Sequence, residues 1–235
     1  MIKGVVFDLD GTLYDYHAND IIAMRKLCQF AKDEFGINED DFRNIFIEAK
    51  KIVKTRLKDG GSRHSRVLHC QTALELLNKS SFTYAMKMND IYWEEFLKNV
   101  KLYDGALKFL QNLKAAKIKT AICTDMTAHI QYMKIERLGI NDLIEILVTS
   151  EETGIEKPAP VMFELALEKL KLNASEVAYF GDSLEKDVEG AARCGLKPFW
   201  FIANREVDEN INNYTKIKSY NNIKFDNTTK NIVEV

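Results

Sequence analysis

The strongest constraint on the fold is a change of pattern near Tyr103. Beyond it, short apolar runs predict strands at 119–123, 144–148, 177–180 and 199–202. The stretches between them have helical periodicity: 104–116, 128–138, 158–170 and 184–194. Repeated strand–helix units predict a parallel sheet with helices on both faces and right-handed crossovers.

A first strand at 5–7 is separated from this alternating part by a long helical stretch. Between about residues 20 and 100 four amphipathic helices follow one another without a strand. We therefore predict an α/β protein. Its core, residues 1–16 and 102–235, is a Rossmann-like doubly wound parallel sheet, and residues 17–101 form an inserted all-helical cap domain. The tail after Asn204 contains one candidate edge strand, within 217–223.

Composition excludes several classes of protein. Lys and Arg number 33 against 35 for Asp and Glu, so the net charge of -2 provides no general attraction for nucleic acid or an acidic membrane. No apolar run approaches the roughly 20 residues that span a bilayer, and no signal peptide is recognisable. We expect a cytoplasmic monomer. Four widely spaced cysteines predict buried, reduced thiols rather than a zinc or redox site: Cys28, Cys70, Cys123 and Cys194.

Ligands of open parallel sheets bind beyond the carboxyl ends of the strands, so the residues that follow each strand matter most. The first strand is followed by Asp8 and Asp10, next to Gly11. Two carboxylates this close raise each other's pKa unless a cation or a proton intervenes. An acidic turn is an equally good explanation of this pair taken alone.

Three later segments add polar groups at corresponding places. They are Thr124-Asp125, Lys157 before a helix that Pro158 starts, and Gly181-Asp182-Ser183 with Asp187. Each alone is also explained by helix capping or a surface charge. Together they supply the parts of a metal-assisted phosphoryl transfer site. One Mg²⁺ and Lys157 would balance Asp8, Asp182 and Asp187, provided that Asp10 carries a proton.

These motifs resemble the haloacid dehalogenase superfamily, in its phosphatase-like branch with a helical cap. The resemblance covers nearly the whole chain in order. It rests on the Val-Val-Phe-Asp-Leu-Asp-Gly-Thr-Leu stretch at 5–13, on Thr124-Asp125, on Lys157-Pro158 and on the Gly-Asp-Ser-Leu-Glu-Lys-Asp stretch at 181–187. The first and last of these motifs are the most specific.

The resemblance implies a role for each residue. Asp8 would be the nucleophile that forms an aspartyl-phosphate, and Asp10 the general acid and base. Thr124 and Lys157 would hold the phosphoryl group, with backbone N–H groups near Gly11 and Asp125. Mg²⁺ would be bound by Asp8, by the backbone carbonyl of Asp10 and by Asp182, while Asp187 orients Lys157 or a metal-bound water. Position 125 is Asp where many relatives carry Asn, and we expect only its backbone to face the phosphate.

The resemblance implies a magnesium-dependent phosphatase that hydrolyses a small phosphomonoester. Asp10 argues against dehalogenation, because dehalogenases of this superfamily lack it. A sugar phosphomutase and a non-catalytic protein that binds a phosphorylated metabolite remain alternatives. The stretch 57–66 is the candidate for substrate contact in the cap: Gly60-Gly61 permits unusual backbone angles, and the donors are Arg63, His64 and Arg66. A solvated connection between two helices is the alternative for this stretch.

Overall fold

The structure is a computed structural model that describes residues 1–203, 205–208, 210–211 and 213–234. β1 (Gly4–Phe7) is fully buried near the middle of a six-stranded sheet of order β3-β2-β1-β4-β5-β6. The other strands are β2 (Lys119–Thr124), β3 (Ile146–Thr149), β4 (Val177–Gly181), β5 (Lys197–Phe201) and β6 (Thr215–Ile217). All five pairings are parallel, which confirms the predicted sheet.

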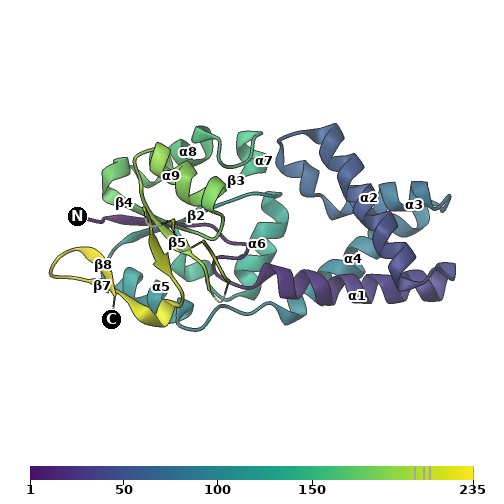
Figure 1. Ribbon diagram of the computed structural model, residues 1–235, viewed down its shortest axis with the longest axis horizontal. Coiled ribbons are helices and arrows are strands. Elements are labelled where there is room, and N and C mark those ends of the chain that lie inside the picture. The colour runs from purple at the N-terminus through teal and green to yellow at the C-terminus, as the bar shows by residue number, and fades with distance from the viewer. Residues whose placement is uncertain (204, 209, 212, 235) are drawn as a thin grey trace.

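Helices cover both faces of the sheet (Figure 1). One face carries α5 (Ala106–Ala115) and α6 (Ala128–Arg137), and the other carries α8 (Pro160–Leu170) and α9 (Gly190–Arg193). Val6 and Phe7 belong to different hydrophobic clusters, because successive strand residues point to opposite faces. Burial on both faces explains why the strands are continuous apolar runs. The helix predicted at 184–194 is divided, since a π-helical segment, Leu184–Glu189, precedes α9.

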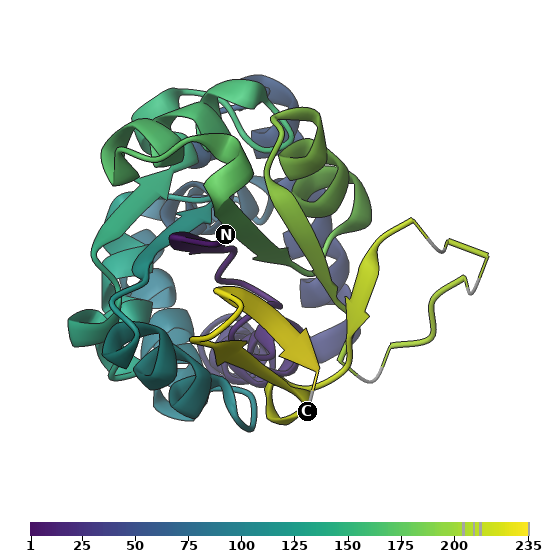
Figure 2. The same cartoon turned by 90° about the vertical axis from the view of Figure 1, so that its left-hand side faces the viewer.

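The tail differs from the prediction. The edge strand is β6, and the stretch 217–223 that was expected to contain it holds a 3-10 turn at Tyr220–Asn222 instead. Ile217, Tyr220 and Ile223 are all buried, and this spacing of three suits a turn better than a strand, which would alternate its faces. An unpredicted antiparallel hairpin follows, β7 (Ile223–Asp226) and β8 (Asn231–Glu234), and it lies beside the N-terminal end of β1 (Figure 2). Residue 204, after which the tail is predicted to begin, lies outside the described residues.

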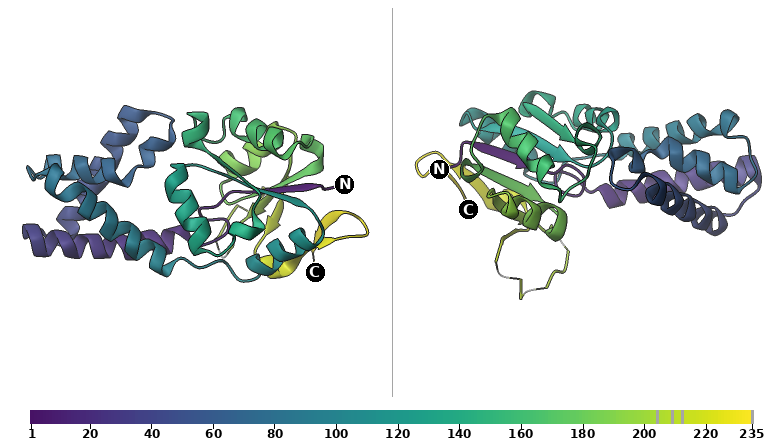
Figure 3. Two further views of the ribbon diagram at one scale, coloured as in Figure 1. Left: turned by 180° about the vertical axis from the view of Figure 1, so that it is seen from behind. Right: turned by 90° about the horizontal axis from the view of Figure 1, so that it is seen from above.

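Four helices stand between β1 and α5: α1 (Tyr16–Phe35), α2 (Glu39–Leu57), α3 (Arg66–Leu76) and α4 (Ser81–Asn99). With the 3-10 turn η1 (Gly61–His64) they form a helical block that extends from the carboxyl edge of the sheet (Figure 3). The Asp15 side chain caps α1 by accepting a hydrogen bond from the Ala18 N–H. Gly36 ends α1 with φ of 71°.

The helical block meets the core at η1, beside α7 (Ser150–Thr153). A Cβ on Gly61 would lie 2.6 Å from the backbone N of Glu151 and 2.7 Å from the carbonyl O of Met126. Neither Gly60 nor Gly61 has a positive φ. The two glycines were expected to provide unusual backbone angles, and that reason is wrong: Gly61 instead permits a close approach of the block to the core.

Three of the four cysteines are buried, Cys194 is half-buried, and all four are free thiols. This agrees with the prediction of reduced cysteines. Within the described ranges, no helix combines the length and the apolar character needed to cross a membrane.

Candidate active site

Four distant segments meet at the carboxyl edge of the sheet. Asp8 directly follows β1, and because β2 and β4 flank β1, Thr124 and Asp182 at their ends lie on either side of it. Asp8 is only 4% exposed, and its Oδ2 accepts a hydrogen bond of 3.0 Å from the Thr12 hydroxyl. The convergence predicted from the strand ends is therefore present in the structure.

Lys157 connects two of the carboxylates. Its Nζ donates to Asp8 Oδ1 at 2.6 Å, to Asp187 Oδ1 at 2.7 Å and to the Tyr179 hydroxyl at 3.3 Å. Burial lowers the pKa of Lys157, but Asp187 and Asp8 more than compensate and raise it well above its ordinary value. The lysine is therefore a fixed positive charge beside Asp8.

Asp8, Asp182 and Asp187 each offer one carboxylate oxygen within 4.8 Å of the others. Burial raises the pKa of Asp8 well above its ordinary range; Lys157 opposes this shift, and the neighbouring carboxylates add to it. Burial and then Asp187 raise the pKa of Asp182 to about 6, although Arg205 pairs with it at 2.9 Å. Burial and mutual repulsion disfavour the ionised form of these carboxylates. Their oxygens, held close together, fit a hard divalent cation.

Asp187 is already well satisfied by protein groups. In addition to Lys157, its carboxylate accepts hydrogen bonds from the Tyr179 hydroxyl at 3.0 Å and the Ser183 N–H at 3.0 Å. A Cβ on Gly181 would lie 2.2 Å from the Asp187 Cβ, so only glycine lets this side chain reach Lys157. These contacts suit a residue that orients Lys157. A Cβ on Gly11, whose φ is 90°, would lie 2.7 Å from Asp182 Oδ2.

Asp10 has partners that the sequence analysis missed. Lys134 Nζ lies 2.7 Å and 2.8 Å from its two carboxylate oxygens, Gln131 Nε2 lies 3.1 Å from Oδ2, and the Tyr14 hydroxyl donates to Oδ1. Lys134 and Gln131 have no exposed surface. The helical periodicity of the sequence indicated these partners, because Gln131 and Lys134 share the face of α6 that carries the apolar residues Ile135 and Leu138.

Thr124 and Asp125 complete the core side of the site. The Thr124 Oγ1 accepts a hydrogen bond of 2.7 Å from Gln131. Asp125 Oδ1 accepts a bond of 3.1 Å from the Lys157 backbone N–H, and Oδ2 pairs with Lys186 Nζ at 3.0 Å. The charge that distinguishes Asp125 from the usual Asn is thus compensated by Lys186.

The carboxylate cluster opens into a cavity of about 270 Å³ between the core and the helical block. The block contributes Tyr16, Lys50, Lys54, His64, Arg66 and His69 to its lining. Arg66 is 4% exposed and donates to the hydroxyls of Tyr92 at 2.7 Å and Tyr16 at 3.1 Å. Burial and Arg66 lower the pKa of His69 to about 3, so this imidazole is neutral.

The remaining donors of the 57–66 stretch bind the core. His64 Nε2 lies 2.5 Å from Glu156 Oε1. Arg63 Nη1 lies 3.7 Å from Glu156 Oε2 and also 3.7 Å from Asp59 Oδ1 of its own stretch. Of the three predicted contact residues, the structure places His64 and Arg66 in the cavity lining and Arg63 outside it. Lys50 and Lys54 were not among the predicted residues.

Several known proteins resemble this chain in sequence. The profile of the haloacid dehalogenase-like hydrolase family matches residues 2–195. Ribulose-1,5-bisphosphate 5-phosphatase of Halopiger xanaduensis is 36% identical over 213 residues, which cover 88% of each chain. Glyceraldehyde 3-phosphate phosphatase of Methanocaldococcus jannaschii is 32% identical over 197 residues, which cover 83% of each chain.

The fold is shared with a solved HAD phosphatase from Thermococcus onnurineus. That structure has a TM-score of 0.72 at 22% identity, and the match covers 94% of this chain and 95% of the other. At this identity the likeness shows the fold alone. On the family profile and these two relatives, each more than 30% identical, the chain belongs to the haloacid dehalogenase-like hydrolase family.

Proposed function

We propose that the protein is a magnesium-dependent phosphatase that hydrolyses a small phosphorylated sugar through an aspartyl-phosphate on Asp8. The observation that carries the proposal is the 2.6 Å contact between the Lys157 ammonium and Asp8, inside a group of three carboxylates that face the cavity. The names of the two relatives support a phosphorylated sugar as the substrate class.

In the first step a carboxylate oxygen of Asp8 attacks phosphorus and the bond from phosphorus to the sugar oxygen breaks. Lys157 keeps Asp8 oriented and offsets the charge of the incoming phosphate. The Thr124 hydroxyl and the backbone N–H groups near Gly11 and Asp125 would bind the phosphoryl oxygens. Thr124 and Asp125 line the same cavity as Asp8.

Asp10 would give a proton to the departing sugar oxygen. In the second step it would take a proton from the water that attacks the aspartyl-phosphate, which restores Asp8 and releases inorganic phosphate. Its side chain is held by Lys134, Gln131 and Tyr14. This fixed position suits a group that must reach first the sugar oxygen and then a water.

The residues that would hold Mg²⁺ are Asp8, Asp182 and the backbone carbonyl of Asp10, with Asp187 orienting Lys157. When bound, the ion would offset the clustered negative charge and polarise the phosphoryl group. Residues 17–101 would form a separate cap domain that covers the site and excludes bulk water.

The test is hydrolysis of p-nitrophenyl phosphate, ribulose 1,5-bisphosphate and glyceraldehyde 3-phosphate, with free phosphate as the readout. We expect release with Mg²⁺, none with EDTA, and none from a folded Asp8→Asn variant. Interconversion of hexose phosphates without free phosphate would favour a mutase. Binding of these compounds without turnover would favour a non-catalytic protein.

A further inference from the structure

Two lysines of the helical block border the cavity opposite the carboxylates. Lys50 and Lys54 lie on α2 and line the same cavity as Asp8 and Asp182. They are four residues apart, so they project from one face of the helix, separated by a rise of about 6 Å. Both are half-buried. We call this pair the α2 lysines.

The neighbouring cations of this region all have carboxylate partners. Arg66 Nη2 lies 3.4 Å from Asp20 Oδ1. Lys186 pairs with Asp125 and Glu156, and Arg63 with Asp59 and Glu156. Among the residues that the structure describes, by contrast, neither of the α2 lysines makes an ion pair or a side-chain hydrogen bond.

Their surroundings make this unpartnered state unfavourable. Burial lowers the pKa of Lys50, and the adjacent Arg66 guanidinium lowers it further. Burial and the charge of Arg63 have the same effect on Lys54. Asp20 and Glu156 oppose these shifts and do not reverse them. A bound anion would remove the repulsion that two half-buried cations experience here.

A second, independent feature is the guanidinium of Arg66. This side chain is almost fully buried and lines the cavity, yet its Nε has no hydrogen-bond partner among the described residues. The block side of the cavity therefore offers several donors and excess positive charge. The core side already holds the groups that would bind the transferring phosphoryl group.

We propose that the α2 lysines bind a second phosphate group of the substrate, so that this enzyme prefers sugar bisphosphates over the corresponding monophosphates. This inference rests on the proposed function, because it assigns the first phosphate to the site at Asp8. Asp8 and the α2 lysines line one cavity of about 270 Å³, so the two phosphates of one small sugar would lie in the same cavity. The phosphate esterified at the far end is bound and not cleaved, since no carboxylate nucleophile faces it from α2.

The test uses matched pairs of ligands as competitive inhibitors of p-nitrophenyl phosphate hydrolysis. The pairs are ribulose 1,5-bisphosphate with ribulose 5-phosphate, and fructose 1,6-bisphosphate with fructose 6-phosphate. We expect the bisphosphate of at least one pair to bind about tenfold more tightly or better. In the Lys50→Met/Lys54→Met double variant, the members of each pair should bind equally within about threefold.

A matched control is Lys51→Met. Lys51 lies on the same helix with its side chain 77% exposed, away from the cavity lining, and this variant should keep the preference for bisphosphates. The unliganded double variant should unfold at a temperature no lower than the wild type does, because charge repulsion is relieved. A wild type without any preference, or a preference that survives in the double variant, would overturn the inference. Hydrolysis of p-nitrophenyl phosphate by the wild type tests the proposed function separately.

Discussion

The ammonium of Lys134 lies 2.7 Å and 2.8 Å from the two carboxylate oxygens of Asp10, and its side chain has no exposed surface. The same ammonium lies 5.3 Å from the ring centroid of Tyr16 and 5.5 Å from that of Trp93, both from the helical block. One buried cation thus joins the proposed acid and base of the core to the aromatic surface of the block.

This ion pair changes the charge balance of the site. From the sequence, neutrality required Asp10 to carry a proton. Lys134 balances an ionised Asp10, so Mg²⁺ and Lys157 remain available to balance Asp8, Asp182 and Asp187. The Asp125–Lys186 pair adds no net charge, and the Arg205 guanidinium beside Asp182 adds one further positive charge. A phosphate dianion can therefore approach whether or not Asp10 is protonated.

Lys134→Met should impair the proton transfer by Asp10 while leaving the attack by Asp8 possible. A sugar oxygen leaves poorly without a proton, whereas p-nitrophenolate leaves as the anion. We expect kcat/KM to fall about 100-fold for a sugar phosphate and much less for p-nitrophenyl phosphate. An Asp10→Asn variant should show the same dependence on the leaving group. Equal losses on both substrates, with an intact fold by circular dichroism, would show that Lys134 has only a structural role.

Gly61→Ala should weaken the fit of the helical block to the core. The new Cβ would meet backbone atoms of Glu151 and Met126 at less than 3 Å, which forces η1 away from α7. We expect a higher KM and a loss of about 1–3 kcal/mol in unfolding free energy. Gly60→Ala is the matched control, because its nearest non-neighbouring atom is 3.6 Å away and its φ is -84°. If both variants behave alike, the close approach at Gly61 is unimportant.

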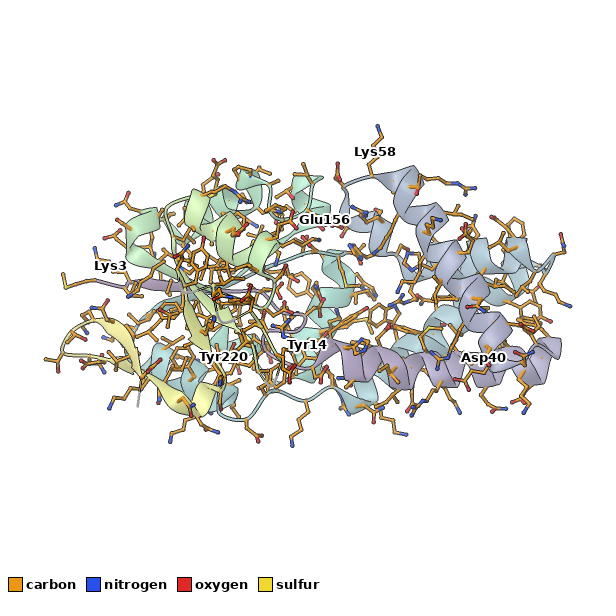
Figure 4. The ribbon with its side chains drawn as sticks, in the orientation of Figure 1. Lys3, Tyr14, Asp40, Lys58, Glu156 and Tyr220 are labelled. Carbon is orange, nitrogen blue, oxygen red and sulfur yellow. The ribbon has the colours of Figure 1, made fainter. Side chains whose placement is uncertain are left out.

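Glu156 joins the core to the helical block, and Figure 4 shows it where the two parts face each other. Burial raises the pKa of Glu156, but the hydrogen bond and charge of His64, together with Lys186, lower it from 4.5 to about 2. A lowered pKa contributes stability that is complete above pH 4.5 and is lost as the pH falls toward 2.

Glu156→Gln should therefore reduce the unfolding free energy at pH 7 by about 1.5–3 kcal/mol. The difference from the wild type should shrink steadily between pH 5 and the lowest pH at which both proteins fold. Urea unfolding at several pH values, followed by tryptophan fluorescence, measures this difference in unfolding free energy. A difference that is constant with pH would mean that the charge of Glu156 contributes nothing.

The residues at strand ends could be predicted because the order of a parallel sheet places its carboxyl ends at one edge. Asp8, Thr124 and Asp182 needed nothing more than that rule. Lys134 was harder to place. Its spacing from Leu138 puts it on the buried face of α6, but a lysine on an amphipathic helix normally faces solvent, and the packing of α6 against the helical block is what buries it.

The block side of the cavity was predicted less well, for a related reason. Arg63, His64 and Arg66 form a local cluster beside two glycines in the sequence, and the prediction rests on that cluster. Lys50 and Lys54 lie within a run of charges on α2, and sequence periodicity does not show which of those charges faces the cavity. The docking of the helices decides which charges face the cavity. The contacts that fix this docking join residues that are distant in sequence.

The account depends most on the covalent role of Asp8. Enzyme mixed with excess substrate and Mg²⁺, quenched in acid and digested, should yield a peptide containing Asp8 that carries one phosphoryl group. Asp10→Asn should increase the fraction of phosphorylated enzyme, because loss of the base slows hydrolysis more than it slows attack when p-nitrophenyl phosphate is the substrate. Asp8→Asn should yield no such peptide and no free phosphate. Phosphate release by folded Asp8→Asn at the wild-type rate, or a phosphoryl group found on a different residue, would contradict the account.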